Sequence, residues 1–314
     1  VPFTLLEQNQ QRTYVAQSGL IGVNGTDLRS RPIFNATQST YQLQEGQQSL
    51  EVILSLTDDT GALINKIYTF SRGSHLVNLT YAVDNRGTQP WSANLFGQLK
   101  RDRSADPTAA GGMGMSAYLG AAFSFPDEKY YRYDFDDMDD ENLKRTELGG
   151  WVGMLQHYFV TAWVPNPQLR NSYSTRVNNN NYIAGFVSPA LELRAGESGT
   201  TSADFYAGPK IQADLEAISE NLDLVVDYGW LWWISQPLFW LLNTMYGFVG
   251  NWGVAIMLTT LCVKAFFFYP SAISYRSMAK MRALAPEIAK LKEKFGDDRA
   301  KMSQGMMELY KREK

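Results

Sequence analysis

An apolar stretch near the C-terminal end of the chain constrains its fold more than any other feature. The 18 residues from Trp252 to Tyr269 contain one charged side chain, Lys264. A helix of that length is just long enough to cross a hydrocarbon core of roughly 30 Å. A cation inside hydrocarbon costs about 3 kcal/mol on insertion scales. The stretch therefore predicts a membrane-spanning helix in which Lys264 needs a specific explanation.

Two interpretations of Lys264 follow from the residues alone. It lies five positions before Tyr269, roughly 7 Å from the end of the span, so its stem can reach the headgroups by snorkelling. Alternatively, Thr260 at i−4 and Ser271 at i+7 lie on the same helical face and form a polar stripe with Lys264, as expected of a water-filled cavity. The spacing leaves both open.

An aromatic segment precedes the span. It contains no charged side chain, and five of the eight tryptophans lie in it: Trp230, Trp232, Trp233, Trp240 and Trp252. Tryptophan is enriched at membrane interfaces, where the ring is apolar and its N–H finds water or headgroups. We expect a short helix over 237–248 in the headgroup plane. Pro237 and the glycines at 247–250 argue against a second full span.

The basic residues predict an orientation. No Lys or Arg occurs between Lys210 and Lys264, where five acids lie, whereas eleven Lys or Arg and six Asp or Glu follow from Arg276 to Lys314. The excess of positive charge marks the cytoplasmic side. We therefore expect residues 1 to about 250 to lie outside, across the membrane from the cytoplasm, and 276–314 to be cytoplasmic.

Residues 1 to about 208 have the pattern of β structure. Apolar side chains alternate with others in LEVILSLT (50–57) and LVNLTYAV (76–83), and the turn signals DDTG (58–61) and NRG (85–87) favour antiparallel hairpins. We expect a large, many-stranded β-sandwich. Pro209 opens a helical pattern that continues to Leu222, which predicts a helix packed as a cap on the sandwich.

The cytoplasmic end is predicted to be a basic, amphipathic helical hairpin. Ile288, Leu291 and Phe295 share one helical face, and Met302, Met306 and Leu309 share another beyond Gly296. Its functional cations are Lys290, Lys292, Lys294, Arg299 and Lys301. Either a solvated surface or contact with anionic lipid, the ribosome or another partner accounts for them.

Several classes of function are disfavoured. The net charge of −3 predicts no direct nucleic-acid binding, and the single cysteine, Cys262, forms no intramolecular disulfide. His75 and His157 have no metal-ligand spacing, and the acidic run 134–141 departs from the EF-hand order, so we expect a solvated acidic loop and no metal. No cofactor motif stands out, and we expect no bond-making enzyme.

Longer blocks of the chain resemble a known family. GGWVGMLQHYFVTAWVP (149–165), GAAFSFPDEKY (120–130), DYGWLWWISQPLFWLL (227–242), VGNWGVAI, YRSMAKMRAL and PEIAKLKEKFGDD are similar to the YidC/Oxa1/Alb3 family of bacterial membrane protein insertases, in its Gram-negative form with a large periplasmic domain. The resemblance runs through nearly the whole chain.

The resemblance implies a mainly β fold with four regions. These are a β-supersandwich with its capping helix (1–222), an interfacial segment (223–250), a transmembrane helix (251–275) and a cytoplasmic hairpin (276–314). It also implies that a first transmembrane helix precedes the chain and four more follow it, in a multi-pass bacterial inner membrane protein whose residues 1 to about 250 are periplasmic. The opening VPFTLLEQ, which has no signal-peptide pattern, agrees with this expectation.

The implied function is insertion of newly made membrane proteins, alone or with the Sec translocon. Members of the family use a hydrophilic groove that carries one basic residue, and the alignment places Lys264 at that position, with Thr260 one turn away. Lysine lacks the guanidinium fork of the arginine common there, so it attracts a carboxylate without bidentate capture. The implied partners are nascent membrane proteins, the Sec translocon with its SecD/SecF accessory complex, the ribosome and the lipid bilayer.

An alternative of a different class is a periplasmic carbohydrate- or ligand-binding β-sandwich anchored by a single transmembrane helix. Tyr130, Tyr131 and Tyr133 would then stack on sugars, and Lys264 would only snorkel. A fold of this kind does not by itself decide between the two hypotheses.

Overall fold

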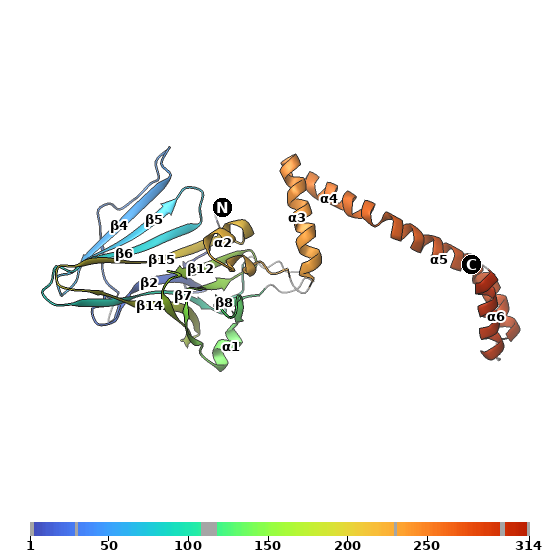
Figure 1. Cartoon of the computed structure of the whole chain (residues 1–314), viewed down its shortest axis with the longest axis horizontal. Helices are drawn as coiled ribbons and strands as arrows, with labels where there is room; N and C mark the ends of the chain where they lie inside the picture. Colours follow the sequence, from blue (N-terminus) through green and yellow to red (C-terminus); the bar gives the residue numbers. More distant parts are fainter. Residues whose placement is uncertain (1–2, 29–30, 108–117, 229–230, 296–298, 313–314) are drawn as a thin grey trace. The chain divides into compact units, whose positions relative to one another are not determined.

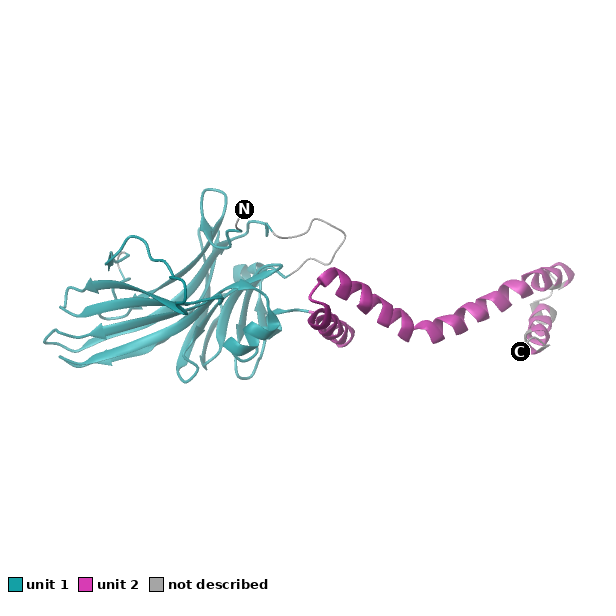
Figure 2. Cartoon of the chain, turned by 90° about the horizontal axis from the view of Figure 1, so that it is seen from above, with its two compact units in different colours: residues 1–227 teal, residues 228–314 magenta. Residues whose placement is uncertain are grey.

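A computed structural model describes residues 3–28, 31–107, 118–228, 231–295 and 299–312. The chain divides into two compact units, Val1–Asp227 and Tyr228–Lys314, shown in different colours in Figure 2. Each unit is described by itself below.

The first unit consists of two antiparallel sheets (Figure 1). The six-stranded sheet has the order β1 (Glu7–Gln8), β2 (Thr13–Ile21), β7 (Trp91–Asp102), β14 (Asn181–Leu193), β13 (Arg170–Asn178) and β10 (Lys144–Leu148). The nine-stranded sheet has the order β3 (Asn35–Ala36), β4 (Ser49–Thr57), β5 (Leu63–Ser71), β6 (Leu76–Asp84), β15 (Ser198–Pro209), β12 (Phe159–Pro165), β11 (Trp151–Leu155), β8 (Gly120–Ser124) and β9 (Tyr131–Tyr133). The expected large β-sandwich is confirmed.

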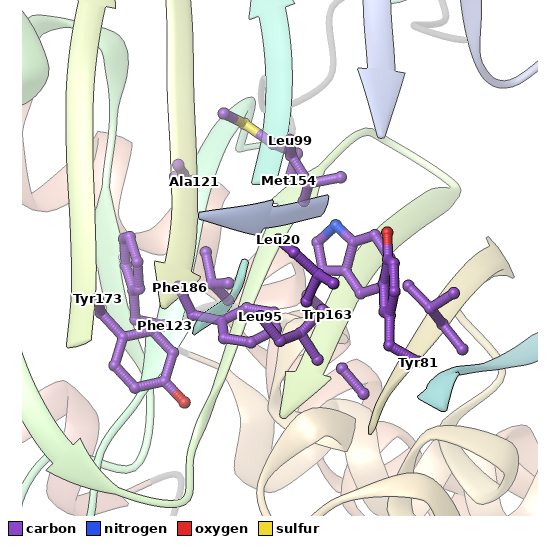
Figure 3. Packing of buried hydrophobic residues seen from close by; sticks show 14 of the residues in the cluster. Leu20, Tyr81, Leu95, Leu99, Ala121, Phe123, Met154, Trp163, Tyr173 and Phe186 are labelled. Atoms are coloured by element: carbon purple, nitrogen blue, oxygen red, sulfur yellow. The ribbon is translucent and has the colours of Figure 1, made fainter. Parts of the chain in front are cut away.

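The main core lies between the two sheets. Along β7 the buried residues alternate with half-buried ones through all 12 positions, because successive side chains of a strand point to opposite faces. Leu95 from the six-stranded sheet and Tyr81, Phe123 and Trp163 from the nine-stranded sheet belong to this one buried cluster (Figure 3). Burial of these large apolar surfaces supplies most of the force that holds the sheets together.

A second, smaller core covers the outer face of the nine-stranded sheet. Leu215 of α2 (Gln212–Ile218) and two residues of the 3-10 helix η1 (Leu222–Val225) are buried in the same cluster as Trp151 and Tyr206. The expected capping helix is therefore present, but it is shorter than predicted. Pro209 is the last residue of β15 and does not open the helix. Its missing N–H is tolerated there because the pairing of β15 with β6 ends at Tyr206, so that Pro209 pairs with β12 alone, as on an edge strand.

The turn signals gave one correct hairpin and one error. The DDTG sequence joins β4 to β5, which pair directly from Thr57 and Leu63. The NRG sequence follows β6, but the next strand, β7, belongs to the other sheet. This turn is a crossing between sheets, and the side chain of Asn85 anchors it by donating to the backbone oxygens of Gln89 and Arg194.

The acidic run was wrongly predicted to be a loop. It forms a short helix, α1 (Phe135–Asp140), with a capping box. The Asp134 side chain accepts from the backbone N–H of Asp137, and the Asp137 carboxylate accepts from the N–H of Asp134. Phe135 and Met138 are buried beneath it, so two apolar anchors and a reciprocal cap outweigh the repulsion among the carboxylates.

The second unit contains four helices: α3 (Trp232–Val249), α4 (Trp252–Phe266), α5 (Phe268–Phe295) and α6 (Arg299–Arg312). Helix α3 begins five residues before Pro237 and includes it, so the expectation that this proline interrupts the segment is wrong. Pro237 lies in the second turn and removes one hydrogen bond, to the carbonyl of Trp233, which the surrounding turns tolerate. Gly250 ends the helix, as expected.

The helix expected over 251–275 is two helices in the structure. They meet at Phe267 with a bend of 55°. Pro270 has no N–H for the carbonyl of Phe266, which weakens the ladder at this point. No single helix in the described ranges is long and apolar enough to cross a membrane, whereas α4 and α5 meet the length and composition criteria only as a bent pair.

Candidate functional site between α3 and α4

A tight turn sets α3 beside α4. Gly250 adopts the left-handed conformation with φ 63° and donates its N–H to the Tyr246 carbonyl at 2.8 Å. The next residue, Asn251, caps α4 by accepting from the N–H groups of Gly253 and Val254. Tyr246 and Trp252 stack across the turn with ring centroids 4.0 Å apart. The sequence VGNW thus encodes a helical hairpin.

A cleft of about 650 Å³ lies between these two helices. One wall is formed by residues of α3 and the residue Tyr228 before it, and the other by α4; the lining side chains are Tyr228, Ser235, Leu238, Phe239, Leu242, Ile256, Thr259, Thr260, Val263 and Lys264. Five of these ten are apolar and five carry a polar group, so the cleft offers an apolar segment a packing surface with polar groups beside it.

The structure brings Lys264 and Thr260 into this one cleft. Lys264 is exposed and is the sole charged side chain in the sequences of α3 and α4. Thr260 lies one turn earlier and donates its hydroxyl to the Ile256 carbonyl at 2.8 Å, which satisfies the group locally. Ser271, expected on the same stripe, is absent from the described lining, because it lies in α5 beyond the 55° bend.

Three polar residues that line the cleft were not predicted as site residues from the sequence. Thr259 lines it with a buried hydroxyl that has no hydrogen-bond partner among the described residues. A buried hydroxyl without a partner is costly, and this oxygen is out of reach of solvent in the structure. Ser235 and Tyr228 lie on the opposite wall. The TT pair within an apolar run was the available signal for Thr259, whereas no periodicity relates Ser235 or Tyr228 to α4.

The predicted interface tryptophans are largely uncovered. Side chains of Trp232 and Trp233 are 60% exposed, and those of Trp240 and Trp252 are 68% and 47% exposed. Trp230 lies outside the described residues. Helix α3 has no buried residue at all, although it is one of the most apolar segments of the chain. Such uncovered apolar surface is typical of a membrane or partner contact.

The predicted basic hairpin is helical on both sides of the residues that the structure leaves undescribed. Lys290, Lys292 and Lys294 are exposed on α5. Arg299 and Lys301 lie in α6, where only their backbone is described. Leu309 of α6 is buried, as the amphipathic pattern predicted.

The sugar-stacking tyrosines are not arranged as that hypothesis requires. Tyr133 is 8% exposed and belongs to the main core, and Tyr131 packs against it and against Phe125. Tyr130 packs near Trp151, with the Arg132 guanidinium over its ring. The three residues therefore do not form an open aromatic platform for a sugar.

Comparison with known proteins identifies two family matches along the chain. Residues 1–241 match the YidC periplasmic domain, and residues 244–314 match the 60Kd inner membrane protein family. The chain is 50% identical over its whole length to the membrane protein insertase YidC of Marinomonas sp. (strain MWYL1), and 51% identical to that of Pseudomonas syringae pv. syringae (strain B728a). It covers 57% and 56% of those relatives.

The chain therefore spans about half the length of the curated relatives it matches. Among solved structures, a galactose mutarotase-like protein from Lactobacillus casei ATCC 334 is similar at 7% identity with a TM-score of 0.38, covering 55% of this chain and 72% of that one. A likeness so distant carries no conclusion about a ligand.

Proposed function

Because this chain belongs to the YidC family of bacterial inner membrane proteins, we propose that it takes part in inserting transmembrane segments of newly made proteins into that membrane. It would do so as a catalyst of transfer into the bilayer, without making or breaking bonds. The observation that carries the proposal is the cleft between α3 and α4, which holds a lone cation among apolar side chains.

The physical task is to move a polar end of a substrate through hydrocarbon. An acidic residue at the bilayer centre costs about 3 kcal/mol on insertion scales. A lysine ammonium 4 Å from a carboxylate contributes about 4 kcal/mol when the effective dielectric constant is near 20. The two terms are of the same size, so Lys264 can offset most of the cost for an acidic substrate residue. The apolar lining meanwhile accepts the rest of the segment.

The two threonines support this role of Lys264. Thr259 and Thr260 both line the cleft, and Thr260 keeps the face beside Lys264 polar. Hydration of the ammonium lowers the cost of holding it at this depth. Because Lys264 lacks a guanidinium fork, its attraction for a substrate carboxylate should depend on charge more than on bidentate geometry. Arginine should therefore replace it with little loss of activity.

The proposed function also suggests partners for the protein and an orientation in the membrane. The nascent membrane protein and the lipid bilayer would meet at the cleft. The first unit would lie in the periplasm and approach the Sec translocon with SecD/SecF, and the exposed lysines of α5 would lie in the cytoplasm and meet the ribosome or anionic lipid. The charge asymmetry of eleven basic to six acidic residues after Arg276 supports this orientation.

A depletion-rescue experiment tests the proposal. Cells depleted of their own insertase would express the full-length protein with Lys264 unchanged, Lys264→Arg or Lys264→Ala, and insertion of a substrate with acidic translocated residues would be scored by protease protection. Lys144→Ala is the matched control, since it removes an exposed lysine of β10 to which the proposal gives no role.

We expect arginine and the control to preserve insertion and alanine to reduce it at least tenfold, at equal protein levels. A substrate without acidic residues should be affected much less. Normal insertion of the acidic substrate by Lys264→Ala would contradict the role given to this charge.

A further inference from the structure

Another cleft, of about 330 Å³, lies on the outer face of the six-stranded sheet. On β14, Ala184 and Phe186 belong to the main core. The alternate residues Ile183 and Val187 point to the opposite face, where they line the cleft. Its volume is at the small end of the range of ligand sites, roughly 300–1,000 Å³, so it suits a group of a few side chains.

The loop between β2 and β3 supplies one wall of this cleft. Asp27 of the loop donates its N–H to the Leu20 carbonyl at 2.9 Å, and its carboxylate accepts from the Leu20 N–H at 3.0 Å. A Cβ on Gly19 would lie 2.4 Å from that carboxylate, so the glycine lets Asp27 lie directly on β2. A wall that is held in place before a ligand arrives loses less entropy on binding.

The charged lining of the cleft has an excess of positive charge. It consists of two arginines, Arg31 and Arg176, and one carboxylate, that of Asp27, which is already engaged by Leu20 and by the Thr26 hydroxyl at 3.2 Å. Within the described ranges, no ion pair joins either arginine to a carboxylate. The cleft therefore favours an anionic group.

Arg176 is positioned across the sheet by two amide side chains. It donates from Nη2 to Gln98 Oε1 at 2.8 Å, and Gln98 in turn donates from Nε2 to Gln17 Oε1 at 2.6 Å. The arginine reaches β7 over β14, where Gly185 pairs with Gln98 and has no side chain in the way. A guanidinium has five N–H donors, so donors remain with which it can bind a carboxylate.

The rest of the lining is largely apolar. The apolar side chains on it are Ile21, Leu28, Phe96, Ile183, Phe186 and Val187. Leu28 is 59% exposed, and the same loop carries Val23 and Ile33, which are 87% and 84% exposed. Exposed apolar side chains gathered in one loop are typical of a protein contact. An apolar floor also disfavours a small, strongly hydrated anion such as phosphate.

We propose that the cleft on the six-stranded sheet docks a short, extended segment of a partner protein, in which a carboxylate is flanked by apolar side chains. The arginines would bind the carboxylate. The floor would receive the side chains two positions before and after it, because alternate side chains of an extended chain point to one face. So small a site selects one motif, which suits a partner of constant sequence better than substrates of many sequences.

The inference goes beyond the proposed function, since the cleft between α3 and α4 shares no lining residue with this one. A binding experiment tests it. The full-length protein in nanodiscs of neutral phosphatidylcholine would be titrated with a fluorescein-labelled peptide containing Leu-Ser-Asp-Ser-Val between glycines, followed by anisotropy. A second peptide has Asn in place of Asp. Soluble dihexanoylphosphatidylglycerol serves as a competing anionic lipid.

Two pairs of variants separate charge from shape. Arg176→Gln removes a cation of the cleft, and Arg170→Gln removes an exposed arginine from the same face of β13 outside the cleft. Ser174→Trp fills the cleft, and Ser172→Trp places the same ring two residues away, outside the lining. Thermal unfolding of the four variants verifies that each is folded.

We expect Arg176→Gln and Ser174→Trp each to weaken binding of the acidic peptide at least fivefold, and the two controls to leave it within twofold. The Asn peptide should bind the unmodified protein at least fivefold more weakly and should not respond to Arg176→Gln. Equal binding by Arg176→Gln and Arg170→Gln, equal binding of the two peptides, or no saturable binding to the unmodified protein would overturn the proposal. Displacement of the peptide by the lipid would also overturn it and would assign the cleft to an anionic lipid.

Discussion

Two glycines with nearly the same backbone angle allow a sharp test of how the β unit is packed. Gly150 has φ of 84° and Gly61 has φ of 87°. A Cβ on Gly150 would lie 2.3 Å from the Ser124 carbonyl oxygen, whereas nothing lies within 4 Å of a Cβ on Gly61. Alanine at either site pays for the left-handed conformation, about 1–2 kcal/mol, partly offset by the lower entropy of the unfolded chain.

Only Gly150→Ala must also push two backbones apart. Overpacking of this kind costs about 1–3 kcal/mol, so we expect a loss of about 1 kcal/mol in the free energy of unfolding for Gly61→Ala and about 3 kcal/mol for Gly150→Ala. Urea unfolding of the full chain in detergent, followed by near-ultraviolet circular dichroism of the buried aromatics, measures both. Equal losses would refute the close contact between the β8 and β11 ends.

Three further predictions follow. Asn85→Ala should lower the free energy of unfolding by about 2–4 kcal/mol, because the backbone oxygens of Gln89 and Arg194 lose their donor. Asn65→Ala is the control: it loses one hydrogen bond from Ser55 and should lower the free energy of unfolding by about 1 kcal/mol. The same urea assay compares the two variants. Burial lowers the pKa of Lys210 to about 8, an effect that Asp227 partly opposes. Above pH 8 the Lys210 amine is therefore still protonated in the unfolded chain but largely neutral in the folded one. The free energy of unfolding should rise by about 2 kcal/mol from pH 8 to about 9.5. A Lys210→Met variant that keeps this rise would show that Lys210 does not cause it. Thr260→Val should reduce insertion of an acidic substrate by about threefold, less than Lys264→Ala does, because it removes hydration and no charge; an effect as large as that of the alanine variant would show that the hydroxyl has another role.

The periodic part of the fold was predictable because it depends on local pattern. The alternation in 50–57 and 76–83 is the alternation of burial in β4 and β6, and the DDTG turn joins neighbouring strands. Which strands pair with one another was not predictable from local pattern. The NRG turn has the same local chemistry as a hairpin, but the buried amide of Asn85 bonds to residues more than a hundred positions away and directs the chain to the other sheet.

Features that depend on tertiary contact were missed for the same reason. The acidic residues of α1 are tolerated because Phe135 and Met138 insert into the core. Lys264 and Thr260 were found because they stand out in an apolar helix, whereas Ser235 and Tyr228 join them only through the turn at Gly250.

Site-specific photo-cross-linking from α4 tests most directly whether the cleft between α3 and α4 receives the substrate. A photoreactive residue would be placed in the full-length protein at Ile256 or Val263, which line the cleft, or at Met257 or Leu261, which are 64% and 63% exposed and lie outside its lining. Ribosomes stalled with a nascent transmembrane segment would supply the substrate. We predict cross-links from Ile256 and Val263 at least threefold stronger than from Met257 and Leu261. Equal or stronger cross-links from Met257 and Leu261 would contradict the assignment of this cleft as the path of insertion.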